Sequence, residues 1–177
     1  MVIALAGRRI DPPGAEIDRF PPQKIDKVTC ELRSLFKTMA ITALVSSAAC
    51  GADLIAISEA GALGARRRVV LPFDPETFRK TSVADRPGDW GAIYDRVLEE
   101  VSLSGDLVIL AESPDNPETY SMTTTAILDE AQRLAGCRAP VAVTVWDGHS
   151  RGADDLTAQF GTEARRRNLR VLQVTTV

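Results

Sequence analysis

The chain has 177 residues, of which 45% are hydrophobic and 25% are charged, and its formal net charge is −3. This length and composition are typical of one globular domain, residues 1–177, large enough to bury a sizeable core. The small negative charge gives no strong signal for binding nucleic acid or an anionic membrane, and the apolar stretches are too short to span a bilayer. The first residues lack the basic start of a signal peptide, so a cytoplasmic location is expected.

In chain order, short apolar runs alternate with segments of helical spacing. We predict strand 2–6, helix 24–39, strand 41–45, helix 52–63, strand 69–71, a short helical turn at 75–80, helix 90–101, strand 107–111, helix 118–134, strand 141–145, helix 154–168 and strand 169–174. Because the strands are continuous apolar runs separated by helices, they are expected to be buried and parallel. The predicted fold is therefore α/β, a Rossmann-like three-layer sandwich with a mostly parallel central sheet and residues 2–6 as its central strand.

Two connecting segments have unusual compositions. Residues 10–23 contain four prolines and a glycine, and a loop of this length is typical of a lid or a binding loop. Arg66-Arg67-Arg68 precedes a predicted strand, and we interpret it as a solvated face of the helix-to-strand turn.

The three cysteines, Cys30, Cys50 and Cys137, are widely separated in the sequence. Their odd number favours buried, reduced thiols over a set of disulfides. His149 is the only histidine, and no cysteines are spaced as in zinc sites, so no metal site is expected. Neither a Walker-type sequence nor Gly-x-Gly-x-x-Gly is present, and no cofactor is predicted.

A cluster of small residues, from Ser46 to Gly51, follows the second predicted strand. Ligands bind at the carboxyl ends of the strands in open α/β sheets, and small side chains let an anionic group approach the free N–H groups at a helix start. We therefore predict that Ser46, Ser47, Ala48 and Gly51 contact a ligand. The alternative is close packing of the strand against the helix.

Charged candidates lie near the same predicted strand ends. Gly7 ends the first strand and is predicted to contact the ligand. Arg8 after it can pair with a phosphate or remain a surface arginine. Asp53 can accept from a ribose hydroxyl or a base amine, or bond its own helix start. Glu112, after the fourth strand, is the carboxylate best suited to general acid or base catalysis, with a solvated loop residue as the alternative.

The loop after the fifth predicted strand supplies the remaining candidates. Asp147 and Gly148 form a tight turn in which Asp147 can bind a ribose hydroxyl or the N–H groups of the turn. Arg151 and Gly152 follow in a loop that is predicted to contact a phosphate.

Several segments spread over nearly the whole chain carry a family resemblance. They are Gly7-Arg8-Arg9-Ile10-Asp11-Pro12-Pro13-Gly14, Arg19-Phe20-Pro21-Pro22, Ser46-Ser47-Ala48-Ala49-Cys50-Gly51-Ala52-Asp53, Leu71-Pro72-Phe73 with Phe78, Ser82 and Val83, and Trp146-Asp147-Gly148 with Arg151-Gly152-Ala153-Asp154. In these segments the chain resembles the SLOG superfamily of DprA/SMF-like and LOG-like proteins, and most closely a bacterial subgroup found beside signalling modules. The resemblance implies a Rossmann-like fold, a nucleotide or nucleotide-derived ligand, and association with signalling proteins or a homodimer.

Two departures from the family pattern bear on function. The Pro-Gly-Gly-x-Gly-Thr-x-x-Glu motif of LOG-type phosphoribohydrolases is absent, and the last loop reads Arg151-Gly152-Ala153-Asp154-Asp155 where the subgroup has Gly-Gly-Thr-Ala-Asp. The leading hypothesis is a sensor or accessory signalling module that binds a nucleotide-derived small molecule. The alternatives are a phosphoribohydrolase-like enzyme with Glu112 as acid or base, and a structural interaction module with a degenerate pocket.

Overall fold

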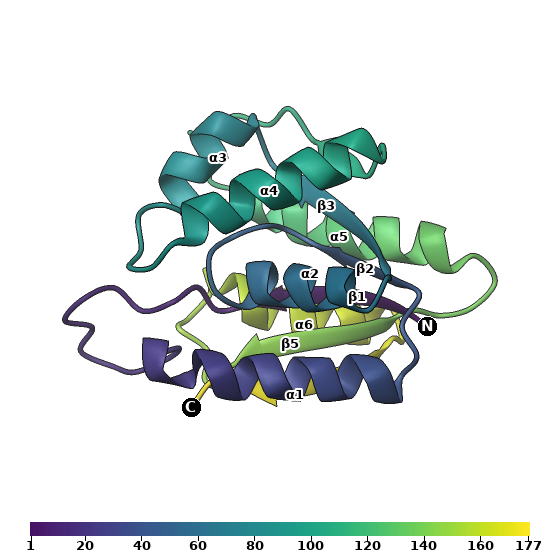
Figure 1. Ribbon diagram of the computed structural model, residues 1–177, viewed down its shortest axis with the longest axis horizontal. Helices are drawn as coiled ribbons and strands as arrows, with labels where there is room; N and C mark the ends of the chain where they lie inside the picture. Colours follow the sequence, from purple (N-terminus) through teal and green to yellow (C-terminus); the bar gives the residue numbers. More distant parts are fainter.

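Six parallel strands form one sheet in the middle of the molecule (Figure 1), and the computed structural model describes all residues, 1–177. The strands are β1 (Val2–Gly7), β2 (Ala43–Ser46), β3 (Arg66–Leu71), β4 (Leu107–Ile109), β5 (Val141–Trp146) and β6 (Arg170–Thr175). Their order in the sheet is β4-β3-β2-β1-β5-β6, and every neighbouring pair is parallel. The α/β Rossmann-like prediction is confirmed, with β1 in the interior of the sheet.

Helices cover both faces of the sheet. They are α1 (Ile25–Thr38), α2 (Ala52–Ala62), α3 (Pro75–Ser82), α4 (Trp90–Leu103), α5 (Thr119–Ala135) and α6 (Leu156–Arg166), and a 3-10 turn, η1 (Pro22–Lys24), precedes α1. The first four pack into one apolar core and α5 and α6 into a second, on the opposite face. None of these helices combines the length and the apolar character that crossing a bilayer requires.

The order in which strands are added to the sheet reverses between β4 and β5, so that β1 and β5 become neighbours. After β1 the chain adds β2, β3 and β4 on one side, and it then returns through α5 to place β5 on the other side of β1. Loops that leave neighbouring strands toward opposite faces open a crevice at the carboxyl ends of those strands. The strand order therefore predicts a crevice at the ends of β1 and its neighbours.

Sequence patterns account for α1 and for the start of α3. Val28, Leu32 and Phe36 recur every four residues and form the buried stripe of α1. At the start of α3, Pro75 occupies the first turn and the Asp74 carboxylate accepts a hydrogen bond from the Thr77 N–H at 2.8 Å. This helix is longer than the short helical turn that was predicted there.

The prediction of a buried strand over 107–111 is wrong in extent and in burial. β4 ends at Ile109, whose side chain is 44% exposed, and Ala111 has a positive φ of 58° that turns the chain. β4 is an edge strand with β3 on one side only, so its apolar run does not become a core strand.

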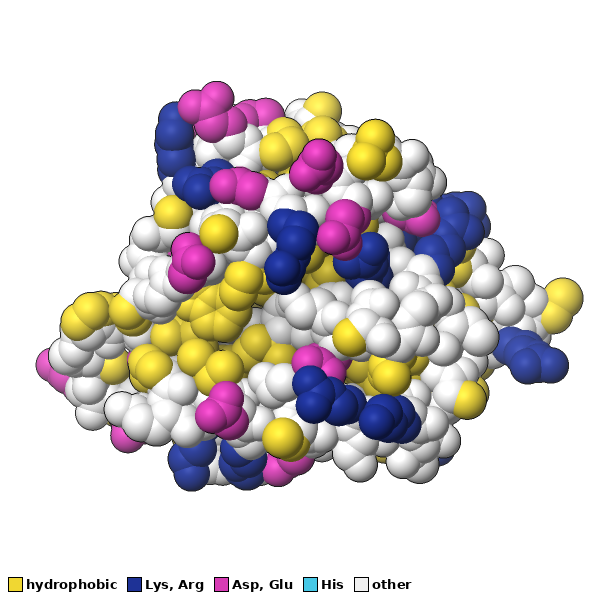
Figure 2. Space-filling model, viewed as in Figure 1, with side chains coloured by type: hydrophobic (Ala, Val, Ile, Leu, Met, Phe, Trp, Pro, Cys, Tyr) yellow, Lys and Arg dark blue, Asp and Glu magenta, His cyan; other side chains and the backbone are white.

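The arginine run is part of β3 rather than a solvated turn before it. Arg66 and Arg68 both pair with the buried carboxylate of Asp106, and Arg67 pairs with Glu100. These ion pairs let three charged residues continue the parallel ladder beside β2. Both signs of charge are interspersed over the face seen in Figure 2.

The cysteine prediction is also wrong for two residues. Cys50 is buried, but Cys30 and Cys137 are exposed. Cys30 lies between Val28 and Leu32 along α1, so the helical phase turns it away from the core.

Candidate functional site

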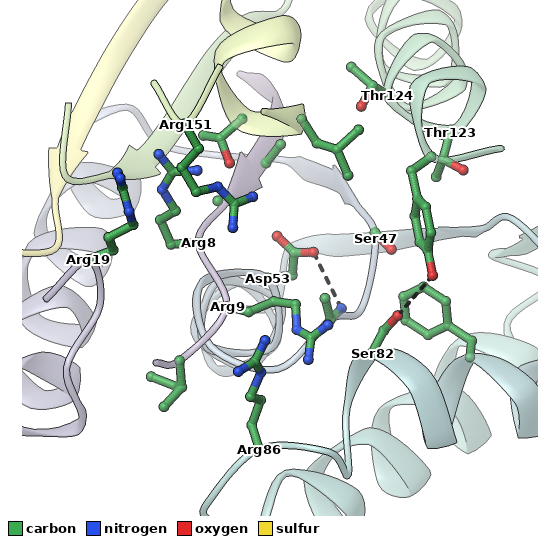
Figure 3. A pocket seen from close by; sticks show the side chains of 18 of the residues that line it. Arg8, Arg9, Arg19, Ser47, Asp53, Ser82, Arg86, Thr123, Thr124 and Arg151 are labelled. Atoms are coloured by element: carbon green, nitrogen blue, oxygen red, sulfur yellow. Dashed lines mark hydrogen bonds between the residues drawn. The ribbon is translucent and has the colours of Figure 1, made fainter. Parts of the chain in front are cut away.

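A cavity of about 330 Å³ lies at the carboxyl ends of β1 and β2 (Figure 3). Its walls come from the loop after β1, the turn between β2 and α2, the end of α3, the N-terminal half of α5 and the start of α6. Segments that are far apart in the sequence therefore meet around one space.

Two glycines let β1 and α2 approach closely beneath this cavity. A Cβ atom on Gly7 would lie 2.4 Å from the Cβ of Ala52 at the start of α2. Gly51 has a φ of 89°, and a Cβ there would lie 2.8 Å from the Arg8 carbonyl oxygen. Gly51, in the turn between β2 and α2, therefore serves strand–helix packing. Gly7, at the end of β1, forms part of the floor of the cavity.

Arg8 is buried in a network of hydrogen bonds on the β5 side of the cavity. Its Nε donates to Asp147 Oδ1 at 2.9 Å, its Nη1 to Asp155 Oδ1 at 2.8 Å, and its Nη2 to the His149 carbonyl at 2.6 Å. The guanidinium also lies 5.4 Å from the ring centroid of Trp146. All three nitrogens have partners, so Arg8 ties β1 to the loop that follows β5.

The loop over residues 10–23 is anchored at both ends. Asp11 Oδ2 accepts from the backbone N–H groups of Arg19 and Phe20, both at 2.9 Å, and the Phe20 side chain is fully buried. Arg19 Nη1 donates to Asp147 Oδ2 at 2.8 Å and to the His149 carbonyl at 3.1 Å. Asp11 and Arg19 both line the cavity, so the loop forms part of its wall.

Arg9 and Arg86 lie on the opposite side of the cavity and are incompletely bonded. Arg9 pairs with Asp85 and donates from Nη1 to the Thr81 carbonyl at 3.3 Å, but its buried Nε has no partner. Arg86 Nε lies 3.6 Å from the same carboxylate, outside hydrogen-bond range, and is also buried without a partner. Two donors on this wall are therefore free.

Asp53 lies between these two sides, in the first turn of α2. Its Oδ2 accepts from the Ala49 N–H at 3.3 Å, whereas Oδ1 is buried with no partner. Burial raises the pKa of this carboxyl to about 7, although the N–H groups of Ala49 and Gly7, the Ser46 hydroxyl and the nearby Arg9 oppose the shift. Asp53 is thus a carboxyl group that titrates near neutral pH and has a free oxygen at the cavity wall.

The remaining wall carries hydroxyl groups and aromatic rings. The hydroxyls belong to Ser47, Ser82, Thr123, Thr124 and Tyr120. Ser82 Oγ and Tyr120 Oη lie 3.4 Å apart, a contact drawn in Figure 3, and Phe78 adds a second ring. This wall offers both stacking surfaces and hydrogen-bonding groups.

The structure brings five of the predicted site residues together around the cavity: Gly7, Arg8, Ser47, Asp53 and Arg151. Others lie outside it. Ser46 Oγ donates to the Leu5 carbonyl within the sheet, Ala48 is fully buried in the core, and Gly51 faces the Arg8 backbone.

The loop after β5 is used mostly for internal bonding. Asp147 accepts from Arg8 and Arg19, and Gly148 and Gly152 adopt positive φ angles of 81° and 114° in the turns that follow. Asp147 and Gly148 do not line the cavity, and Gly152 lines a separate polar groove between α5 and α6.

Glu112 is not part of the cavity. It follows β4 at the edge of the sheet, its backbone N–H bonds the Pro72 carbonyl, and its side chain makes no hydrogen bond. Two strands, β3 and β2, separate β4 from β1, and this order could not be read from the sequence.

Several cavity residues were missed by sequence reasoning. Arg8 was a predicted site residue and Arg9 was not. Adjacent residues at a strand end point in opposite directions, yet both arginines reach the cavity wall. Arg86, Thr123 and Tyr120 belong to segments without a motif. The return of α5 over the sheet brings Thr123 and Tyr120 to β1, and the loop after α3 brings Arg86 there.

Comparisons with known proteins assign no family. No model of a known protein family matches the chain, and no curated protein is significantly similar to it. No group of three or more histidine, cysteine, aspartate or glutamate residues is arranged to hold a metal ion. The chemistry of the cavity is therefore the basis for assigning a function.

Proposed function

We propose that the protein binds a nucleotide-derived small molecule in this cavity and acts as a sensor or accessory signalling module. One observation carries the proposal: Arg9 Nε, Arg86 Nε and Asp53 Oδ1 are all buried without a partner in residues that line one cavity. Buried polar groups in folded proteins are nearly always hydrogen-bonded, and leaving them unbonded costs about 1–3 kcal/mol each. A ligand with both acceptor oxygens and a donor group would satisfy all three atoms.

Nucleotides supply this combination of groups. Phosphate oxygens accept charge-assisted hydrogen bonds from guanidinium groups, and sugar hydroxyls or base amines can donate to Asp53. A base can pack against Phe78 or Tyr120, which line the far wall. The volume of about 330 Å³ falls within the range of roughly 300–1,000 Å³ that is usual for small-molecule sites. The SLOG resemblance points to the same ligand class.

A hydrolase is the second candidate, and Asp53 is the observation that favours it. A carboxyl group with a pKa of about 7 is matched to general acid or base catalysis at neutral pH. We prefer a binding module because the LOG-type signature is missing from the sequence and Glu112 lies outside the cavity.

A thermal-shift screen tests the proposal with adenosine and guanosine monophosphates, their cyclic forms and NAD derivatives as probes. A nucleotide present at 100 times its Kd should stabilise the protein by about 2.7 kcal/mol. Arg9→Gln should weaken the shift by removing a cation from the cavity. Arg133→Gln, which removes an exposed arginine of α5 that pairs with Glu130, is the matched control.

The same incubations distinguish a sensor from a hydrolase. Chromatography after several hours should find no free base if the protein only binds nucleotides. Base release that disappears in Asp53→Asn would replace the sensor proposal with a hydrolase that uses Asp53. Base release that disappears in Glu112→Gln would instead support Glu112 as the general acid or base. If no probe shifts the melting temperature, nucleotide binding is excluded for these ligands and the structural interaction module becomes the better hypothesis.

A further inference from the structure

The arginines around the cavity form two separate groups. Arg8, Arg19 and Arg151 make up the β5-side group, and Arg9 and Arg86 make up the α3-side group. In Figure 3 the two groups lie on opposite sides of Asp53.

The β5-side group has one positive charge more than its carboxylate partners can neutralise. Its three guanidinium groups share two carboxylates, those of Asp147 and Asp155, and Arg8 and Arg19 take the short contacts. Arg151 Nε lies 3.7 Å from Asp155 Oδ2 and its guanidinium makes no hydrogen bond. Burial and the neighbouring Arg8 lower the pKa of Arg151, as expected for a cation without a close counter-charge.

The α3-side group has the same imbalance. Arg9 and Arg86 share a single carboxylate, Asp85, and each retains a buried Nε without a partner. Two guanidinium groups against one carboxylate again leave one positive charge in excess.

Neither of the two other carboxyl groups on the cavity wall forms an ion pair. Asp11 is bound by the backbone N–H groups of Arg19 and Phe20. Asp53 Oδ2 accepts a hydrogen bond from the Ala49 N–H, and its buried Oδ1 has no partner at hydrogen-bond distance. A phosphate placed directly against Asp53 would be repelled when that carboxylate is ionised, so an anionic group fits on either side of Asp53 better than beside it.

We propose that the ligand carries two anionic groups on opposite sides of a hydrogen-bond donor, which is the chemistry of a nucleoside bisphosphate with phosphates at two positions of its sugar. The inference rests on the proposed function. One phosphate pairs with Arg151 and the other with Arg9 and Arg86, and a sugar hydroxyl between them donates to Asp53. Each excess positive charge then receives one anionic partner.

A diphosphate chain at one end of the sugar fits this arrangement less well. It would bring two phosphates to one group of arginines and leave the excess charge of the other group without a partner. Affinity should therefore depend on where the phosphates are attached as well as on their number.

Titration calorimetry with three nucleotides of each purine tests this inference: the 5′-monophosphate, the 5′-diphosphate and the 3′,5′-bisphosphate of adenosine and of guanosine. For the base that binds more tightly, the Kd of the 3′,5′-bisphosphate should be lower by about tenfold or more than the Kd of the 5′-monophosphate or of the 5′-diphosphate. Arg151→Gln and Arg86→Gln should each abolish the tighter binding of the bisphosphate, because each substitution removes an arginine that pairs with one of the two phosphates. Arg133→Gln should preserve it.

The variants are expected to fold, because neither the Arg86 nor the Arg151 guanidinium makes a hydrogen bond, and melting temperatures without ligand verify this. Equal affinity for the monophosphate, diphosphate and bisphosphate would overturn the inference and leave the proposed function intact. Preference for the bisphosphate that survives both substitutions would also overturn it. Absence of binding by all six nucleotides would overturn the inference and the proposed function together.

Discussion

Arg8 and Arg9 are neighbours in the sequence, but they have opposite environments. All three guanidinium nitrogens of Arg8 are bonded and its side chain is only 3% exposed. The Arg9 side chain is 29% exposed, and its buried Nε has no hydrogen-bond partner. Arg8 thus stabilises the fold, whereas Arg9, the next residue, has a guanidinium nitrogen left for a ligand.

The contrast extends to the two sides of the cavity. On the β5 side, most of the charged groups bond one another and hold the loop after β5 against β1, and the one buried polar atom without a partner is the indole Nε1 of Trp146. On the α3 side, and at Asp53 between the two, buried donors and an acceptor remain free. Complete bonding of buried charge indicates a structural role, whereas incomplete bonding around a cavity indicates a place for a ligand.

The largest expected effect is on stability at Arg8. Arg8→Met should lower the free energy of unfolding by about 3–5 kcal/mol, because Asp147 and Asp155 would remain buried with too few partners. Arg9→Met, the matched substitution, should cost less than about 1 kcal/mol, because its ion pair is partly exposed. Urea denaturation measures both values, and equal losses for the two variants would remove the distinction between the two arginines.

Ionisation of Asp53 should change the free energy of unfolding by a smaller, pH-dependent amount. Its pKa is about 7 in the folded protein and near its ordinary value of 3.8 in the unfolded chain, so between these pH values the folded state holds a proton that the unfolded state has released. Stability from this group is therefore lost as the pH rises toward and past 7. From pH 5 to pH 8 the loss should amount to about 2–3 kcal/mol.

Asp53→Asn removes this titration while keeping the shape of the side chain. Urea denaturation of both proteins at several pH values isolates the contribution of Asp53, since all other groups titrate in both. The variant should gain stability relative to the natural protein as the pH rises from 5 to 8. Parallel curves for the two proteins would mean that Asp53 is ordinarily ionised and that its free oxygen is not isolated from water.

The smallest effect concerns two adjacent alanines in the turn after β2. Ala48 is fully buried in the core, whereas Ala49 lines the cavity. Ala48→Leu should cost about 1–3 kcal/mol by overpacking. Ala49→Leu should leave the melting temperature nearly unchanged but weaken binding of any nucleotide that the screen identifies. A large drop in melting temperature for both variants would assign the whole turn to packing.

Much of the fold could be predicted because it follows from local patterns. Apolar runs that alternate with amphipathic segments indicate parallel strands joined by helices, and parallel strands end at one rim of the sheet. The stripe of Val28, Leu32 and Phe36 and the prolines of the loop after β1 are signals of the same local kind. These patterns predicted a ligand crevice across the carboxyl ends of the strands, and the cavity lies at the ends of β1 and β2 but does not include Glu112 or Asp147.

Which side chains form the cavity depended on the three-dimensional arrangement. Ser46 and Ser47 are adjacent, yet one bonds the neighbouring strand and the other faces the cavity, because successive side chains of a strand point to opposite faces. Glu112 was separated from the site by the position of β4 at the sheet edge, and Arg86 was brought to it by the loop after α3. Strand order, side-chain direction and the pairing of charges arise from contacts between distant segments, so no local pattern in the sequence could specify them.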